Sequence, residues 1–228
     1  MNIRGLLKSA TVVALLAGTI VGLSACSMKG FEMDAAGMTQ SEVERLSLES
    51  QFGLMSARYQ RMQDLLEQAQ LRVADVDTTW VWISSGIAPT QGTYAPTPLE
   101  GATSGNSYFL HAIRAVRLPD SSGAREDLDP LLKLFEEQGW VVDISGDSER
   151  GWTARTVTAD GYRMSYQVQP NGQYNLDVVS DGFWGDRRGL LEAVVSRVPE
   201  ANLGAEESLP GEYDSFPEWS LPSEPNNA

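Results

Sequence analysis

Few residues of this 228-residue sequence are suited to chemistry: one histidine, one cysteine and a small group of carboxylates. His111 is the only residue whose side chain, unperturbed, changes charge near neutral pH. A histidine can activate a serine, but the chain has no Gly-x-Ser-x-Gly turn to expose one. We therefore interpret His111 as a surface or hydrogen-bonded residue rather than a catalytic one.

The carboxylates Asp143, Asp147 and Glu149 cluster around a predicted turn, where they could bind a hard cation such as calcium. Their spacing differs from that of an EF-hand loop, so a solvated turn is the favoured interpretation. Nothing in the sequence places two acids across a cleft, so no general acid/base pair is predicted. We expect no metal and no cofactor.

The composition limits the class of protein further. The chain is 42% hydrophobic, which is typical of a globular domain, and its 17 basic against 31 acidic residues give a net charge of −14. Such an acidic chain has no electrostatic basis for binding a phosphate backbone, so no nucleic-acid partner is expected. With one cysteine and one histidine, neither a disulfide framework nor a zinc cluster can form within the chain.

The first 26 residues have the layout of an export signal. Arg4 and Lys8 precede an apolar run over residues 10–22, which is too short to span a bilayer comfortably. The run ends in Leu23-Ser24-Ala25-Cys26. An ordinary secretory signal with a chance cysteine is the alternative, but Leu23 fits the small-residue requirement of that cleavage poorly.

This leader resembles the bacterial lipoprotein signal, in which Leu, a small residue and Ala or Gly precede an obligatory cysteine. The resemblance implies cleavage before Cys26, a diacylglyceryl thioether on its sulfur, and further acylation, for example by palmitate, of the new amino terminus. Two or three acyl chains anchor a protein stably. Fourteen of the 17 basic residues are arginines, and this bias, with the leader, resembles envelope lipoproteins of high-GC Gram-positive bacteria.

The sequence accordingly divides into four segments. Residues 1–25 are the predicted signal peptide, 26–38 a lipidated tether, 39–198 a single α+β domain, and 199–228 an acidic tail. The tail has five prolines, seven acids and no base, so we expect it to be disordered. Its alternating aromatic and acidic residues leave open a second interpretation, a docking peptide.

Two amphipathic helices are predicted in the domain. Thr39 and Ser41 each precede a glutamate by three residues, which indicates a capping box, and an apolar stripe runs from Leu48 to Val73. We expect one long helix there, covering a sheet of the same chain rather than forming an intermolecular coiled coil. A second helix over 125–138 ends at Gly139.

Strands are predicted over 78–84, 107–118 and 140–144, followed by two hairpins; segment 107–118 also fits a helix. A two-residue Asp160-Gly161 turn would place Trp152 on the polar face together with Arg163. For the second hairpin a three-residue loop over 170–172 keeps the faces consistent. The predicted fold is α+β, with both helices on one face of a mostly antiparallel sheet that ends in a C-terminal β-meander.

The long segment 86–106 has no predicted regular element and is the expected adaptable surface. Tyr94 in this loop, together with Trp152 and Arg163 on the polar sheet face, forms the predicted binding surface for an envelope protein or glycan. The hypothesis is thus a non-enzymatic binding module, anchored to the membrane through Cys26 on its extracytoplasmic side. The alternative is a hydrolase or transferase of envelope polymers that uses carboxylates and His111.

Overall fold

The structure, a computed structural model, describes residues 32–119, 121–198 and 207–220. Cys26 and the signal segment lie outside these residues, as do parts of the predicted tether and tail. Among the helices described, none has the length and apolar character that a membrane span requires.

The core is built on a seven-stranded sheet in which all neighbouring strands are antiparallel. Its strands in spatial order are β10 (Glu207–Ser208), β1 (Trp80–Ser84), β4 (His111–Arg117), β8 (Gln173–Ser180), β7 (Tyr162–Val168), β6 (Gly151–Val157) and β5 (Val142–Asp147). A smaller sheet joins β2 (Thr90–Gln91), β3 (Ser107–Phe109) and β9 (Phe183–Trp184). Segment 107–118, predicted as one strand, is extended but divides into two strands of different sheets, β3 and β4, with Leu110 between them.

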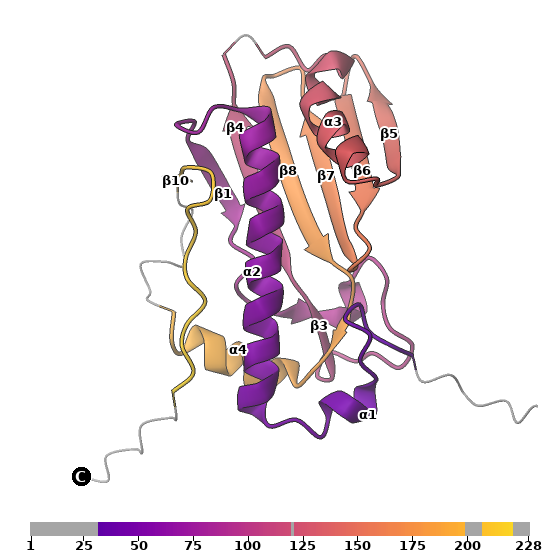
Figure 1. Cartoon of the computed structure of the whole chain (residues 1–228), viewed down its shortest axis with the longest axis vertical. Coiled ribbons are helices and arrows are strands. Elements are labelled where there is room, and N and C mark those ends of the chain that lie inside the picture. The colour runs from indigo at the N-terminus through magenta and orange to yellow at the C-terminus, as the bar shows by residue number, and fades with distance from the viewer. Residues whose placement is uncertain (1–31, 120, 199–206, 221–228) are drawn as a thin grey trace, which may run out of the picture. The chain divides into compact units, whose positions relative to one another are not determined.

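Helices cover one face of the large sheet. Helix α2 (Leu48–Val73) crosses that face with α3 (Asp129–Glu137) beside it (Figure 1). The remaining helical segments of the described residues are α1 (Gln40–Val43), α4 (Arg187–Val195) and two short 3-10 turns, η1 (Gly92–Tyr94) and η2 (Arg125–Leu128). This arrangement confirms the predicted α+β class with helices packed on a mostly antiparallel sheet.

The predicted long N-terminal helix is in fact two helices. The Thr39–Glu42 capping box is present and begins α1, but α1 ends after one turn. A second cap starts α2, because the Ser47 hydroxyl accepts a hydrogen bond from the Ser50 N–H at 3.1 Å. The apolar stripe that follows is buried as expected, and it packs on the sheet of the same chain.

The β7–β8 hairpin has the predicted register. Val168 lies opposite Tyr174 and Tyr166 opposite Leu176, as a three-residue loop over 170–172 requires. Gly172 occupies the left-handed position with φ 76°, which a side chain would strain.

The β6–β7 hairpin differs from the prediction by one residue. Thr158 and Tyr162 close a three-residue loop: the Thr158 N–H donates to the Tyr162 carbonyl at 2.8 Å, and the Thr158 hydroxyl accepts from the Tyr162 N–H at 3.0 Å. A shift of one residue turns every side chain of β6 to the other face. Trp152 therefore lies on the helix-covered face, opposite Val168, and not on the polar face.

The described part of the predicted tail, residues 207–220, packs on the domain; we call it the C-terminal strap. Its first two residues form β10 at the edge of β1. The ring of Phe216 lies 4.9 Å from that of Phe52 in α2, and Trp219 lies 5.2 Å from the same ring. This order differs from the disorder expected over 199–228, because the aromatic residues of the strap find apolar partners that composition alone does not reveal.

Candidate functional site

The face of the large sheet opposite α2 and α3 is the candidate site, and we call it the open face. Exposed aliphatic side chains lie at its two sides, Val81 and Ile83 on β1 and Val157 on β6. Polar side chains occupy the strands between them. Alternation along the paired strands places on this face Val81, Ile83, His111, Ile113, Asp143, Ser145, Thr153, Arg155, Val157, Arg163, Ser165, Gln167, Asn175, Asp177 and Val179.

A row of polar residues crosses the middle of the open face. Asp143 pairs with Arg155, Arg155 with Ser165, and Ser165 with Asp177, each on the neighbouring strand. The Arg155 guanidinium donates to the Ser145 hydroxyl at 2.6 Å and is otherwise turned to solvent. The row thus carries alternating acidic, basic and neutral groups over four strands.

His111 is hydrogen-bonded to Asp177 at one end of this row. Its Nε2 lies 3.1 Å from Asp177 Oδ1, and about a third of each side chain is exposed. The hydrogen bond to Asp177 raises the pKa of His111, and partial burial opposes that rise. His111 is therefore a hydrogen-bonded surface residue, which agrees with its interpretation from the sequence.

This geometry does not place Ser165 where His111 could activate it. The strand order β4–β8–β7 places Asp177 between His111 and Ser165, whereas a serine nucleophile needs the histidine next to it. Nor do the carboxylates form a pair. Asp143 on β5 and Asp177 on β8 are three strands apart, about 14 Å at ~4.8 Å per strand, against roughly 5 to 9.5 Å in glycosidases.

The other predicted carboxylate, Asp147, stabilises the β5–β6 turn. Its side chain accepts hydrogen bonds from the backbone N–H groups of Glu149 at 3.0 Å and Arg150 at 2.8 Å. These bonds lower the pKa of Asp147. Within the described part of the chain, His, Cys, Asp and Glu side chains form no group of three placed to hold a metal ion.

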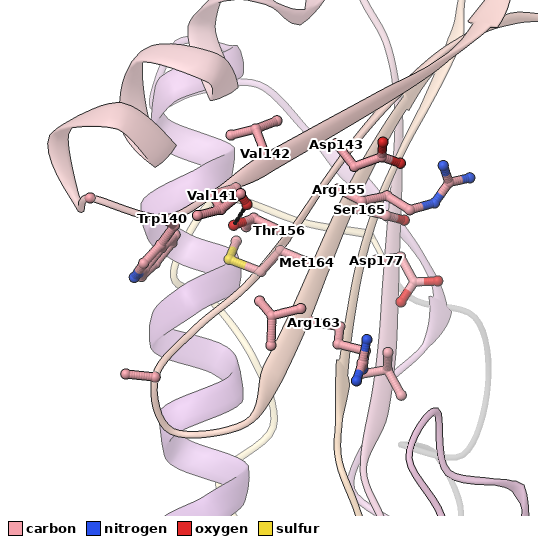
Figure 2. Close-up of a pocket in the computed structure, with 14 residues that line it drawn as sticks. Trp140, Val141, Val142, Asp143, Arg155, Thr156, Arg163, Met164, Ser165 and Asp177 are labelled. Atoms are coloured by element: carbon pink, nitrogen blue, oxygen red, sulfur yellow. Dashed lines mark hydrogen bonds between the residues drawn. The ribbon is translucent and has the colours of Figure 1, made fainter.

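A cavity of about 920 Å³ opens at the sheet edge where β5 begins. Strand β5 pairs with β6 only as far as Thr156, so residues 157–159 continue past it without that neighbour. Val141, which is 88% exposed, and Val157 give this edge an apolar rim. Figure 2 shows the row of polar residues on one side of the strands and Trp140 with Met164 on the other. The cavity therefore reaches around this edge of the sheet.

The residues predicted for the binding surface are not all brought together. Arg163 is on the open face, where its Nε donates to Asp181 at 2.9 Å and its Nη2 to Thr97 at 2.6 Å. Tyr94 is 73% exposed in η1. Trp152 is partly buried on the opposite face, and Cys26 lies outside the described residues.

The row of Asp143, Arg155, Ser165 and Asp177 was not predicted. Its members come from strands whose pairing order is set by long-range contacts, and the one-residue error in β6 hid Arg155. The alternation of polar residues within each strand was the available signal.

Comparison with known proteins gives little further information. No family model matches the chain, and no curated protein is similar enough to report. Among solved structures, the chain is similar to LppA from Mycobacterium tuberculosis, described as a candidate lipoprotein, at 12% identity and a TM-score of 0.41. The similarity covers 70% of this chain and 94% of that one.

Proposed function

We propose that this chain is a membrane-anchored, extracytoplasmic lipoprotein whose domain binds another protein of the cell envelope through the open face. The signal-like leader and the Leu23-Ser24-Ala25-Cys26 sequence support the anchor. The binding role is supported by the broad sheet face that the described helices leave uncovered.

The open face has the composition of a protein interface. Exposed Val81, Ile83 and Val157 supply apolar contact area, while the row from Asp143 to Asp177 supplies hydrogen-bonding groups of both charges. This combination of aliphatic margins and a polar centre is the observation that carries the proposal.

A glycan is the weaker candidate ligand. That alternative relied on the ring of Trp152, which lies on the helix-covered face. None of the strand residues assigned to the open face is Phe, Tyr or Trp. A protein partner is therefore the occupant we propose.

Photocrosslinking in cells tests this function. A photoreactive residue replaces Gln167 on β7, in the open face, and a matched control replaces Glu136, which is exposed on α3. We expect one defined protein adduct from position 167 and none from position 136. The adduct should disappear when Ile83→Glu and Arg155→Glu are combined, since both side chains are exposed on the open face.

An adduct that survives the double substitution, or that forms equally from position 136, would show that the open face is not the interface. The anchor has its own test, because Cys26→Ala should leave the membrane fraction or stay unprocessed. If this variant partitions and migrates like the parent, the lipid anchor is wrong.

A further inference from the structure

The segment that follows Cys26 is fixed to the domain much earlier than the predicted tether end at residue 38. The Asp34 side chain is fully buried, and its Oδ1 accepts hydrogen bonds from the N–H groups of Ala36 and Met38, both at 2.9 Å. Its Oδ2 accepts from the Trp184 N–H at 3.2 Å and lies 3.4 Å from Arg58 Nη2. One carboxylate thus joins this segment to α2 and β9.

Further hydrogen bonds secure the same segment on both sides of Asp34. The Trp184 indole Nε1 donates to the Glu32 carbonyl at 3.2 Å, and the Ala35 N–H donates to the Gly182 carbonyl at 3.2 Å. The Glu32 carboxylate also accepts from the Glu100 N–H. The described chain is therefore held on the domain from Glu32 onward.

This attachment leaves little chain between a lipid on Cys26 and the domain. Six residue steps separate Cys26 from Glu32, which span at most about 22 Å when fully extended. Helix α2, with 26 residues, is about 39 Å long by itself. A lipid on Cys26 would consequently keep the Glu32 end of the domain near the bilayer, because the reach is shorter than the helix.

We call this region the tether end; it comprises residues 32–35, 94–100, 158–162 and 181–184. Its exposed surface includes two large apolar side chains, Met33 at 64% exposure and Tyr94 at 73%. Tyr94 precedes Thr97, the partner of Arg163, by three residues. Tyrosine is enriched at membrane interfaces, where its ring and hydroxyl both find suitable surroundings. These residues suit contact with lipid headgroups.

Three of the five acidic residues of the tether end are paired with arginines; the other two are Glu32 and Glu100. Asp160 pairs with Arg61 at 2.8 Å, and Asp181 pairs with Arg163 at 2.9 Å. With the buried Asp34–Arg58 pair, three aspartates at this end have an arginine partner. Such pairing reduces repulsion between the acidic chain and the anionic lipids of a bilayer surface.

We propose that the tether end lies directly against the bilayer, with Met33 and Tyr94 in its interfacial layer. This orientation rests on the lipid anchor of the proposed function. It places Arg163, at the start of β7, close to the membrane, and the β7–β8 turn at 169–173 farthest from it. The outer part of the open face is then the part that a partner protein reaches first.

Hydrogen exchange on vesicles tests this orientation. The chain beginning at Cys26 is coupled through its only thiol to a maleimide lipid in phosphatidylcholine vesicles, and the reference is the same chain capped with a soluble maleimide. We expect slower exchange over 92–100 and 158–162 on vesicles, and no change over 147–150 and 169–173. Equal protection at both ends, protection of the far turns alone, or no protection would overturn the proposal.

Paired variants sharpen the result. Met33→Glu with Tyr94→Glu should abolish the protection, whereas Leu71→Glu with Val76→Glu, also exposed but at the far end of α2, should keep it. Protection that persists in the first pair contradicts the proposed contact. Because the maleimide supplies the anchor, these outcomes are independent of lipidation in cells, which the Cys26→Ala fractionation tests separately.

Discussion

Arg58 and Asp34 form a buried ion pair that connects the middle of α2 to the start of the described chain. The guanidinium also donates to the Tyr108 hydroxyl at 2.7 Å and lies 4.0 Å from the centre of the Phe183 ring. Both carboxylate oxygens of Asp34 and the Arg58 guanidinium have hydrogen-bond partners. The cost of burying the two charges is therefore offset locally.

Asp34→Asn should be strongly destabilising, because it leaves the Arg58 cation buried without a counter-charge. We expect a loss of about 3 to 5 kcal/mol in the free energy of unfolding, measured by urea denaturation. Asp160→Asn is the matched control, since its pair with Arg61 is more than a third exposed; it should cost less than about 1 kcal/mol. Similar losses in both variants would show that burial of the first pair does not matter.

Phe216→Ala should weaken the seating of the C-terminal strap. Its ring contacts Phe52 at 4.9 Å and Tyr59 at 5.6 Å, but it is only partly buried, so we expect a loss of about 1 to 2 kcal/mol. Limited proteolysis should cleave the strap sooner in this variant. Glu218→Ala, at an exposed strap position, should change neither measurement. Unchanged stability of Phe216→Ala would mean that the strap is not held there.

His111 should titrate above its ordinary pKa of 6.5 in the parent and closer to it in Asp177→Asn, because Asp177 raises the pKa. A raised pKa means that the interaction stabilises the fold below the unfolded pKa and that this stability is lost as pH rises through the folded pKa. The parent should therefore exceed the variant in stability by more at pH 5.5 than at pH 8.5.

Nuclear magnetic resonance provides the direct measurement, because the chain has one histidine and hence one imidazole signal in tag-free protein. The other neighbours of His111 across the sheet do not offer it a free acid. Val179 lies opposite His111 and is uncharged, and Arg163, beyond Val179, is paired with Asp181. Asp177 is therefore the acid to remove. Identical titration curves for the parent and the variant would contradict the hydrogen bond between His111 and Asp177.

Two glycines with positive φ should differ in their tolerance of alanine. Gly139, with φ 69°, has open space where a Cβ would lie, so Gly139→Ala should cost only about 1 kcal/mol of backbone strain. A Cβ at Gly151, with φ 92°, would overlap the Val168 carbonyl oxygen in β7, so Gly151→Ala should cost roughly 3 kcal/mol or more. Thermal denaturation of both variants measures the difference, and equal midpoints would argue against the close approach of β6 and β7.

The sequence allowed the β7–β8 hairpin to be predicted because only one loop length kept its faces consistent. Tyr162, Met164, Tyr166 and Val168 alternate cleanly with polar residues, so an error in register would have buried Asp177. Local chemistry and global packing agreed at Pro170-Asn171-Gly172. Helices α2 and α3 were predictable because their apolar stripes were regular, but the break between α1 and α2 was not predicted.

The β6–β7 hairpin could not be predicted because β6 itself is ambiguous. Trp152, Ala154 and Thr156 on one face and Thr153 with Val157 on the other are both compatible with a half-buried strand. The Asp160-Gly161 pair then favoured a two-residue turn, whereas the Thr158 hydroxyl stabilises a longer one. The predicted binding surface therefore differs from the observed open face. Trp152 lies on the helix-covered face, and Arg155 lies on the open face.

The C-terminal strap has a consequence for biosynthesis. The Tyr59 hydroxyl donates a hydrogen bond to the Asp214 carbonyl, and these two residues are 155 positions apart in the sequence. During synthesis and export, the strap emerges after the rest of the described domain. The aromatic surface of α2 is covered only then, so folding cannot be completed in step with synthesis. Until residues 207–220 have emerged, Phe52 and Tyr59 lack their strap partners and the aromatic surface of α2 is uncovered.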